Sequence, residues 1–371
     1  MARTCRLVRA GRSVDAQWRR DGDALIISPA GAPALVVRLG EVSRLAGDGF
    51  TVRLRLPDGE IALERLGGDG PTLLEALWRD WPVVRAEVLR LAGGGRSTAV
   101  FSGNIAASGS VPGPFHGFFV GERLIVAPGA GDIVALFAAD FSSVAFDEEA
   151  YALRATGWDG GQTVFSKLGG SSAAFSGALL TARETLSRQA AEVFARFLPT
   201  LGAGPRAELT AQWLPGRLLS FEDLERIAPG FDVSFGSSWL AATPRAEAGR
   251  AMMAGLATGD RYLGYAAPAD GEAPFLWLLV IKGEKAGLEV LSHGDYATYL
   301  FRGGEELPGL VQGLVRLPEF SREALYLPIE QLTDERGSYA IPARDLPLLR
   351  DLRARFAGRK VHSASSPVEK Q

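Results

Sequence analysis

The chain contains one cysteine and three histidines, and this scarcity excludes several kinds of site. Cys5 alone cannot form a disulfide within the chain or a metal site built from cysteines. The histidines, His116, His293 and His362, are scattered and lack the spacing of metal ligands. We therefore expect no metal and no cofactor. The single cysteine also favours a reducing, cytoplasmic setting.

A strong excess of one charge and a long apolar run are missing as well. The 40 Lys and Arg residues are balanced by 43 Asp and Glu residues, which gives a formal net charge of −3. This balance argues against a partner nucleic acid. The apolar run at residues 275–281 is far shorter than the roughly 20 residues of a membrane-spanning helix, so we expect a soluble protein. Almost all cations are Arg, and Ala and Gly are abundant, which indicates a GC-rich and therefore bacterial genome.

What the sequence does contain is a pattern of short segments that occurs twice in tandem. Residues 22–29 read GDALIISP, and residues 121–128 read GERLIVAP. Residues 63–68 read LERLGG, residues 165–170 read FSKLGG, and a helical pattern follows each pair of glycines. The repetition predicts two copies of one small domain, at residues 1–95 and 97–201.

Within each copy, six or seven β-like runs precede one helix. Residues 50–56 carry apolar side chains at every second position, beginning with Phe50, which predicts a strand with one solvent-facing side. Asp69-Gly70-Pro71 predicts the start of the first helix, and Pro82 is expected to kink or split it. Ser171 or Ser172 is expected to cap the second helix.

Residues 207–320 repeat this pattern only in part. Residues 259–268 resemble the segment at 121, and Gly303-Gly304 occupies the place of Gly169-Gly170. We interpret this region as a diverged third copy with a helical insertion at 220–256, where Ser220 caps a helix. Residues 321–362 are expected to form a C-terminal extension with a helix over 344–356, and residues 363–371 a disordered tail.

Antiparallel strands closed by a C-terminal helix resemble the pleckstrin-homology-like (PH-like) superfold, including its GRAM and bacterial PH branches. The expected fold class is α+β, with three tandem PH-like barrels of which the third is diverged. Residues 1–95 and 97–201 match the superfold in size and element order. The resemblance implies a barrel plugged at one end by its helix, which binds lipid headgroups, peptides or other proteins and is seldom catalytic.

The first predicted hairpin carries a cluster of arginines with only Asp15 opposing them before residue 21. In PH-like proteins that bind phosphoinositides, this hairpin holds the phosphate-binding cations, and the guanidinium group suits phosphate because it donates two bonds at once. The favoured alternative, which is the commoner case, is a solvated basic edge that discourages strand-to-strand aggregation. The candidate residues are Arg6, Arg9, Arg12, Arg19 and Arg20.

Two aromatic tracts, at 231–239 and 295–301, are candidates for a partner-binding groove, with core packing as the favoured alternative. Their candidate contact residues are Phe235, Trp239, Tyr296 and Tyr299. His293 and Asp295 have the residue types of a hydrolase triad, but a hairpin turn explains them better.

The sequence thus predicts a bacterial, cytoplasmic, non-catalytic protein-binding or scaffold component. One alternative is a peripheral membrane module that binds anionic lipid through the Arg-rich hairpin. A hydrolase that uses His293 is the least favoured alternative.

Overall fold

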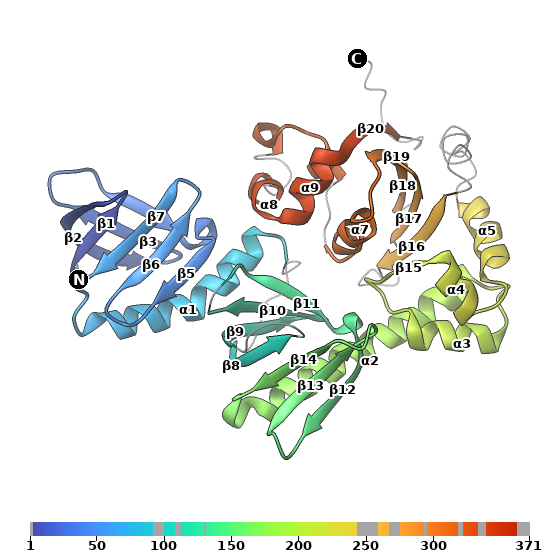
Figure 1. Cartoon of the computed structure of the whole chain (residues 1–371), viewed down its shortest axis with the longest axis horizontal. Coiled ribbons are helices and arrows are strands. Elements are labelled where there is room, and N and C mark those ends of the chain that lie inside the picture. The colour runs from blue at the N-terminus through green and yellow to red at the C-terminus, as the bar shows by residue number, and fades with distance from the viewer. Residues whose placement is uncertain are drawn as a thin grey trace. The chain divides into compact units, whose positions relative to one another are not determined.

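The computed structural model describes residues 3–91, 100–107, 113–129, 131–242, 259–266, 275–292, 295–317, 322–332 and 339–361. These residues form an α+β protein with three antiparallel sheets of seven, seven and six strands. The chain divides into two compact units, Met1–Ala182 and Arg183–Gln371. Figure 1 colours the chain from its N-terminus to its C-terminus and labels the elements.

The first sheet has the strand order β4-β3-β2-β1-β7-β6-β5. Strand β1 pairs with both β2 and β7, so the strands that come first and last in the chain are neighbours in the sheet. Helix α1 (Asp69–Val88) follows the last strand, and we call this sheet with α1 module 1. The other elements are β1 (Arg3–Arg9), β2 (Arg12–Asp21), β3 (Ala24–Pro29), β4 (Leu35–Arg38), the 3-10 turn η1 (Leu39–Glu41), β5 (Arg44–Gly47), β6 (Val52–Leu56) and β7 (Gly59–Glu64).

Alternating side chains of these strands form the core of module 1, and α1 contributes Trp81. Its indole is fully buried and donates a hydrogen bond of 2.8 Å to the carbonyl oxygen of Val42. The buried guanidinium of Arg85 donates to the carbonyl oxygen of Gly40 at 2.6 Å. Helix α1 continues through Pro82, so of the two effects expected of this proline, a kink or a split, the split does not occur. The two side-chain bonds and the buried indole fix the helix on the sheet on both sides of Pro82.

The second sheet repeats the same order, β11-β10-β9-β8-β14-β13-β12. Its first strand again pairs with its last, and helix α2 (Ser172–Phe197) follows. We call this sheet with α2 module 2; α2 contributes residues to both compact units. Rings of three strands surround Phe175 of α2 at 5.0–6.2 Å. The other elements are β8 (Val100–Ala107), β9 (Gly113–Val120), β10 (Arg123–Pro128), β11 (Val134–Phe137), η2 (Ala138–Asp140), β12 (Phe141–Asp147), β13 (Ala152–Gly157), β14 (Gln162–Ser166) and η3 (Gly169–Ser171).

The third sheet, in the second unit, is a plain meander of order β15-β16-β17-β18-β19-β20. This order differs from that of the first two sheets. The last strand, β20, pairs with β19, the strand before it in the chain, and not with the first strand, β15. Its elements are α3 (Ala203–Gln212), β15 (Leu218–Ser220), α4 (Phe221–Ile227), α5 (Phe231–Ala242), β16 (Asp260–Ala266), β17 (Phe275–Lys282), β18 (Lys285–Ser292), β19 (Asp295–Arg302), α7 (Leu307–Val315), η4 (Arg322–Leu325), η5 (Ile329–Leu332), α8 (Ala340–Asp345), α9 (Pro347–Arg355) and β20 (Phe356–Val361).

Local predictions for the second unit have mixed outcomes. The cap at Ser220 is confirmed, because its hydroxyl oxygen accepts a bond of 3.0 Å from the amide of Asp223. The single helix expected over 344–356 was wrong: two helices cover this stretch, with Pro347 at the start of the second. Strand β20 then follows directly, so residues of the expected extension form an edge of the third sheet.

The start of α1 lies very close to the β5–β6 turn. A Cβ atom added at Gly70 would lie 1.8 Å from the carbonyl oxygen of Gly49, a distance that no side chain can tolerate without a backbone shift. A Cβ added at Gly68 would meet nothing within 4 Å. Gly70 is therefore needed for packing, whereas Gly68 is not.

We predict that Gly70→Ala lowers the free energy of unfolding by about 1–3 kcal/mol, the usual cost of overpacking. Gly68→Ala is the control, because Gly68 has the backbone φ of a right-handed helix, and it should change the stability by less than about 0.5 kcal/mol. Urea denaturation of both variants measures the difference, and equal effects would contradict the assigned contact.

Candidate functional site

Two of the five predicted arginines, Arg9 and Arg12, lie at the hairpin end of module 1. They face each other across the β1–β2 ladder, beside a turn in which Ala10 and Gly11 have left-handed φ values of 49° and 75°. A cavity of about 420 Å³ opens there, between this turn and the β3–β4 loop that contains Pro33. We call it the hairpin-end cavity.

The remaining predicted cations do not converge on this cavity. Arg19 forms an ion pair of 3.1 Å with Asp21, and Arg20 forms one of 2.7 Å with Asp80. The pKa of Asp80 is lowered, chiefly by its hydrogen bonds with Arg79 and with Arg20 as a further cause. The structure therefore divides the predicted cluster into paired cations and cations at cavities.

Arg9 is itself compensated by Asp58, whose carboxylate accepts a bond from its guanidinium. The guanidinium of Arg12 has no ion-pair or hydrogen-bond partner within the part of the chain that the structure describes. Two like charges directly opposite each other destabilise a hairpin. Because Asp58 compensates Arg9, Arg12 is the cation of this pair that stays available to bind an anion.

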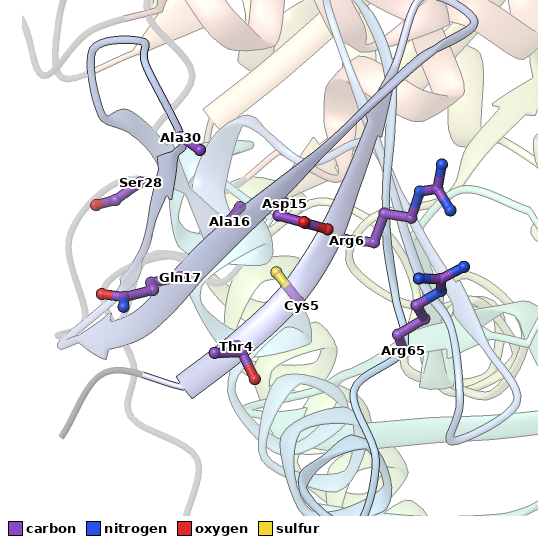
Figure 2. Close-up of a pocket in the computed structure, with 9 residues that line it drawn as sticks. All are labelled: Thr4, Cys5, Arg6, Asp15, Ala16, Gln17, Ser28, Ala30 and Arg65. Carbon is purple, nitrogen blue, oxygen red and sulfur yellow. The ribbon is translucent and has the colours of Figure 1, made fainter.

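A second cavity, of about 510 Å³, lies on the outer face of the same sheet (Figure 2). We call it the outer-face cavity. Arg6 is the one predicted cation that lines it, and Arg65, which was not among the candidate residues, lines it as well. The pairing of β1 with β7 brings these two together, because Arg6 lies opposite Glu64, the residue before Arg65. The polar side chains around the cavity are Thr4, Arg6, Asp15, Gln17, Ser28 and Arg65.

Cys5 also lines the outer-face cavity but is unsuited to nucleophilic chemistry. It is 6% exposed, and burial raises the pKa of its thiol to about 11. A protonated thiol is a poor nucleophile at neutral pH. Within the described residues, no group of three or more His, Cys, Asp and Glu side chains could hold a metal ion.

Both modules present an exposed aromatic residue in the turn between their fifth and sixth strands. Phe50 of module 1 is 71% exposed, and Tyr151 of module 2 is 58% exposed. Phe146 lies beside Tyr151 with ring centroids 5.5 Å apart. The strand pattern had grouped Phe50 with the apolar residues of β6, but β6 begins at Val52 and Phe50 lies in the turn.

An aspartate fixes each of these turns. The Asp48 carboxylate accepts bonds from the amides of Phe50 and Thr51, at 3.0 and 2.9 Å, and these bonds lower its pKa. The carboxylate of Asp147 accepts from the amide of Ala150 at 2.9 Å and from Arg154 at 2.8 Å, which lowers its pKa as well. The aromatic residues are therefore held at ordered positions.

Two of the four aromatic candidates of the second unit, Phe235 and Tyr299, are core residues. Phe235 is 4% exposed and packs against Phe221 at 5.3 Å, and Tyr299 is 1% exposed. Their burial agrees with the core alternative and removes them from any accessible groove. Trp239 lies within α5 and Tyr296 within β19, but the structure does not describe the positions of their side chains.

His293 lies outside the described residues, between β18 and β19. These two strands pair from Lys285–Arg302 to Ser292–Asp295. His116, in contrast, is well described: its ring stacks on Trp78 with centroids 5.0 Å apart, and its Nδ1 lies 2.9 Å from the hydroxyl oxygen of Ser102.

Comparison with known proteins gave neither a matching protein family nor a significant match to a curated protein. No helix among the described residues is long and apolar enough to cross a membrane. The case for function therefore rests on the geometry of the two cavities and the two aromatic turns.

We predict that His116 titrates below the ordinary histidine pKa of 6.5, because burial against Trp78 disfavours the charged ring. Since the unfolded chain then binds more protons, this residue should make the protein less stable as the pH falls below about 6.5. NMR titration of the imidazole signals measures the pKa, and His116→Gln identifies the resonance. Trp78→Ala should raise the pKa towards 6.5, and an unchanged pKa would contradict the role of the stack.

Proposed function

We propose that the protein is a non-catalytic protein-binding or scaffold component of a bacterial cytoplasm, and that modules 1 and 2 are PH-like domains. Their common strand order, the pairing of first with last strand and the helix that follows support this assignment. The order of the third sheet is different, so the proposal does not extend the PH-like assignment to the second unit.

The observation that carries the binding role is the repeated exposed aromatic turn. Aromatic residues dominate the energetics of protein interfaces, and an exposed ring on an ordered turn loses little conformational entropy on binding. Phe50 and Tyr151 lie in the corresponding turn of the two modules, between the fifth and sixth strands. In each turn an aspartate carboxylate accepts hydrogen bonds from backbone amides and holds the turn in place.

We predict that the full chain, used as bait in a lysate of its native host, enriches a protein that the double variant Phe50→Ser, Tyr151→Ser does not. Loss of two interface anchors should reduce recovery by about tenfold or more. Val36→Ser is the matched control, because Val36 is 52% exposed on the edge strand β4 and lies away from both turns. Mass spectrometry of the eluates measures the enrichment. Equal recovery with the wild type and the double variant would overturn the assignment of the turns.

A second candidate function is binding of anionic lipid at the hairpin-end cavity. Arg12 favours it, since this cation lines the cavity and faces Arg9 without a carboxylate partner in the described part of the chain. The pairing of Arg19 and Arg20 with carboxylates limits the site to one end of the sheet. Such a site would add a membrane contact to the scaffold.

For this candidate, co-sedimentation with vesicles of phosphatidylcholine and phosphatidylglycerol is the test. We predict that Arg12→Gln weakens binding about fivefold, the effect of one cation near an anionic surface. Arg19→Gln is the control, because Arg19 is paired with Asp21. Equal losses would indicate a general charge effect, and absence of binding by the wild type would exclude the membrane role.

A further inference from the structure

The outer-face cavity is an unexpected hollow on a solvent-facing side of a sheet. Short side chains, Thr4, Ser28 and Ala30, line it on β1, on β3 and just beyond β3. The long side chains of Arg6 and Arg65 lie together on one side of the cavity (Figure 2). The hollow of about 510 Å³ is large enough for a small organic molecule.

The two arginines on this side of the cavity are suited to hold an anion. Their guanidinium groups extend in the same direction in Figure 2 and line one cavity. Arg6 donates one bond of 2.6 Å to the hydroxyl oxygen of Ser13, which leaves its other N–H groups available. Arg65 has no ion-pair or hydrogen-bond partner among the residues described. A phosphate or carboxylate group between the two would relieve their repulsion and accept bidentate bonds.

The two acidic neighbours of Arg6 do not neutralise it. Asp15 lies opposite Arg6 on β2, and Glu64 lies opposite it on β7. The structure records no ion pair of Arg6 with either, within the described part of the sheet. The guanidinium instead bonds to Ser13. Arg6 is thus held in place without a carboxylate.

The position of Arg65 is set by its backbone. Its φ of 56° lies in the left-handed region that glycine and asparagine prefer, directly after β7. Lys167 has a φ of 54° at the equivalent place after β14. A cation is therefore kept at this strained position in both modules. In module 1 the strained turn brings it to the cavity wall.

Asp15 supplies the opposite charge inside the same cavity. The amide of Ala30 donates a bond of 2.9 Å to the backbone carbonyl of Asp15, which anchors this part of β2 to the chain after β3. The carboxylate of Asp15 has no hydrogen-bond or ion-pair partner among the described residues. The cavity therefore offers two cations and one carboxylate, together with the amide of Gln17.

We propose that the outer-face cavity binds a small zwitterion of amino-acid size. Its anionic group lies between Arg6 and Arg65, and its ammonium group faces Asp15. This chemistry is present in free O-phosphoserine and in the headgroup of phosphatidylserine. The site is separate from the aromatic turns and from the hairpin-end cavity, so it does not depend on the function proposed above.

Isothermal titration calorimetry of the full chain with O-phosphoserine tests the site. Arg6→Gln and Arg65→Gln should each weaken binding about tenfold, the effect of losing a hydrogen bond to a charged group. Asp15→Asn should weaken binding of O-phosphoserine but not of inorganic phosphate, because phosphate has no ammonium group. Arg19→Gln is the matched control, because Arg19 is paired with Asp21 and lines neither cavity, and it should leave the affinity unchanged. Far-UV circular dichroism checks that each variant is folded.

A second arm distinguishes the source of the ligand. Vesicles of phosphatidylcholine with phosphatidylserine are compared with vesicles of phosphatidylcholine with phosphatidylglycerol, which lacks the ammonium group. Binding to free O-phosphoserine that depends on Arg65 supports a soluble ligand, and Arg65-dependent preference for phosphatidylserine vesicles supports a lipid. Absence of binding to both probes at millimolar concentration, or binding that Arg6→Gln and Arg65→Gln leave unchanged, would overturn the proposal.

Discussion

The pairing of the first strand with the last is the constraint on which modules 1 and 2 depend. In module 1 the ladder between β1 and β7 joins residues that are far apart in the sequence, such as Arg6 and Glu64, and it delivers the chain to the start of α1. The helix can then bury Trp81 and Arg85 against backbone carbonyls that follow β4. The same ladder places Arg65 beside Arg6 on the outer face. In module 2 the ladder between β8 and β14 has the equivalent role, since it places Phe165 beside Phe115 and Phe175. Core packing and surface chemistry thus depend on one set of backbone hydrogen bonds.

Local features of this fold could be predicted from the sequence because they depend on neighbouring residues. The start of α1 follows from Asp69-Gly70-Pro71, and the cap of α4 follows from Ser220 and Asp223. The repetition of short segments predicted two copies of one domain, and the first two sheets have the same strand order. The split considered at Pro82 does not occur, because side-chain hydrogen bonds of Trp81 and Arg85, on either side of it, hold the helix on the sheet. Strand β20 was missed, since residues 356–361 gain their partner only from β19. Pairing across the chain leaves no periodic signal in a short segment.

The candidate site was predictable only in part for the same reason. Clustering in the sequence identified Arg6, Arg9 and Arg12, but it also included Arg19 and Arg20, whose partners Asp21 and Asp80 neutralise them. Asp80 lies on α1, and no reading of the first hairpin could reveal it. For the aromatic candidates, the favoured interpretation as core holds for Phe235 and Tyr299, whereas Phe50, which alternation assigned to a strand, is exposed in a turn. Composition finds aromatic residues, but only packing decides which of them reach solvent.

The two modules differ in how they use the same face of the sheet. The registers make Ser102 and His116 the counterparts of Thr4 and Gln17, and Asn104 the counterpart of Arg6. In module 2, His116 on this face stacks on Trp78 of α1, while Ser102 stays exposed. Asn104 and Pro114 stand where module 1 has Arg6 and Asp15, so this pair of opposite charges is present only in module 1. The cation after the last strand, in contrast, is present in both modules, where Arg65 and Lys167 hold it in a left-handed conformation at a cost of about 1–2 kcal/mol each. The strained cation therefore belongs to the shared turn, whereas Arg6 and Asp15, which line the outer-face cavity, are specific to module 1.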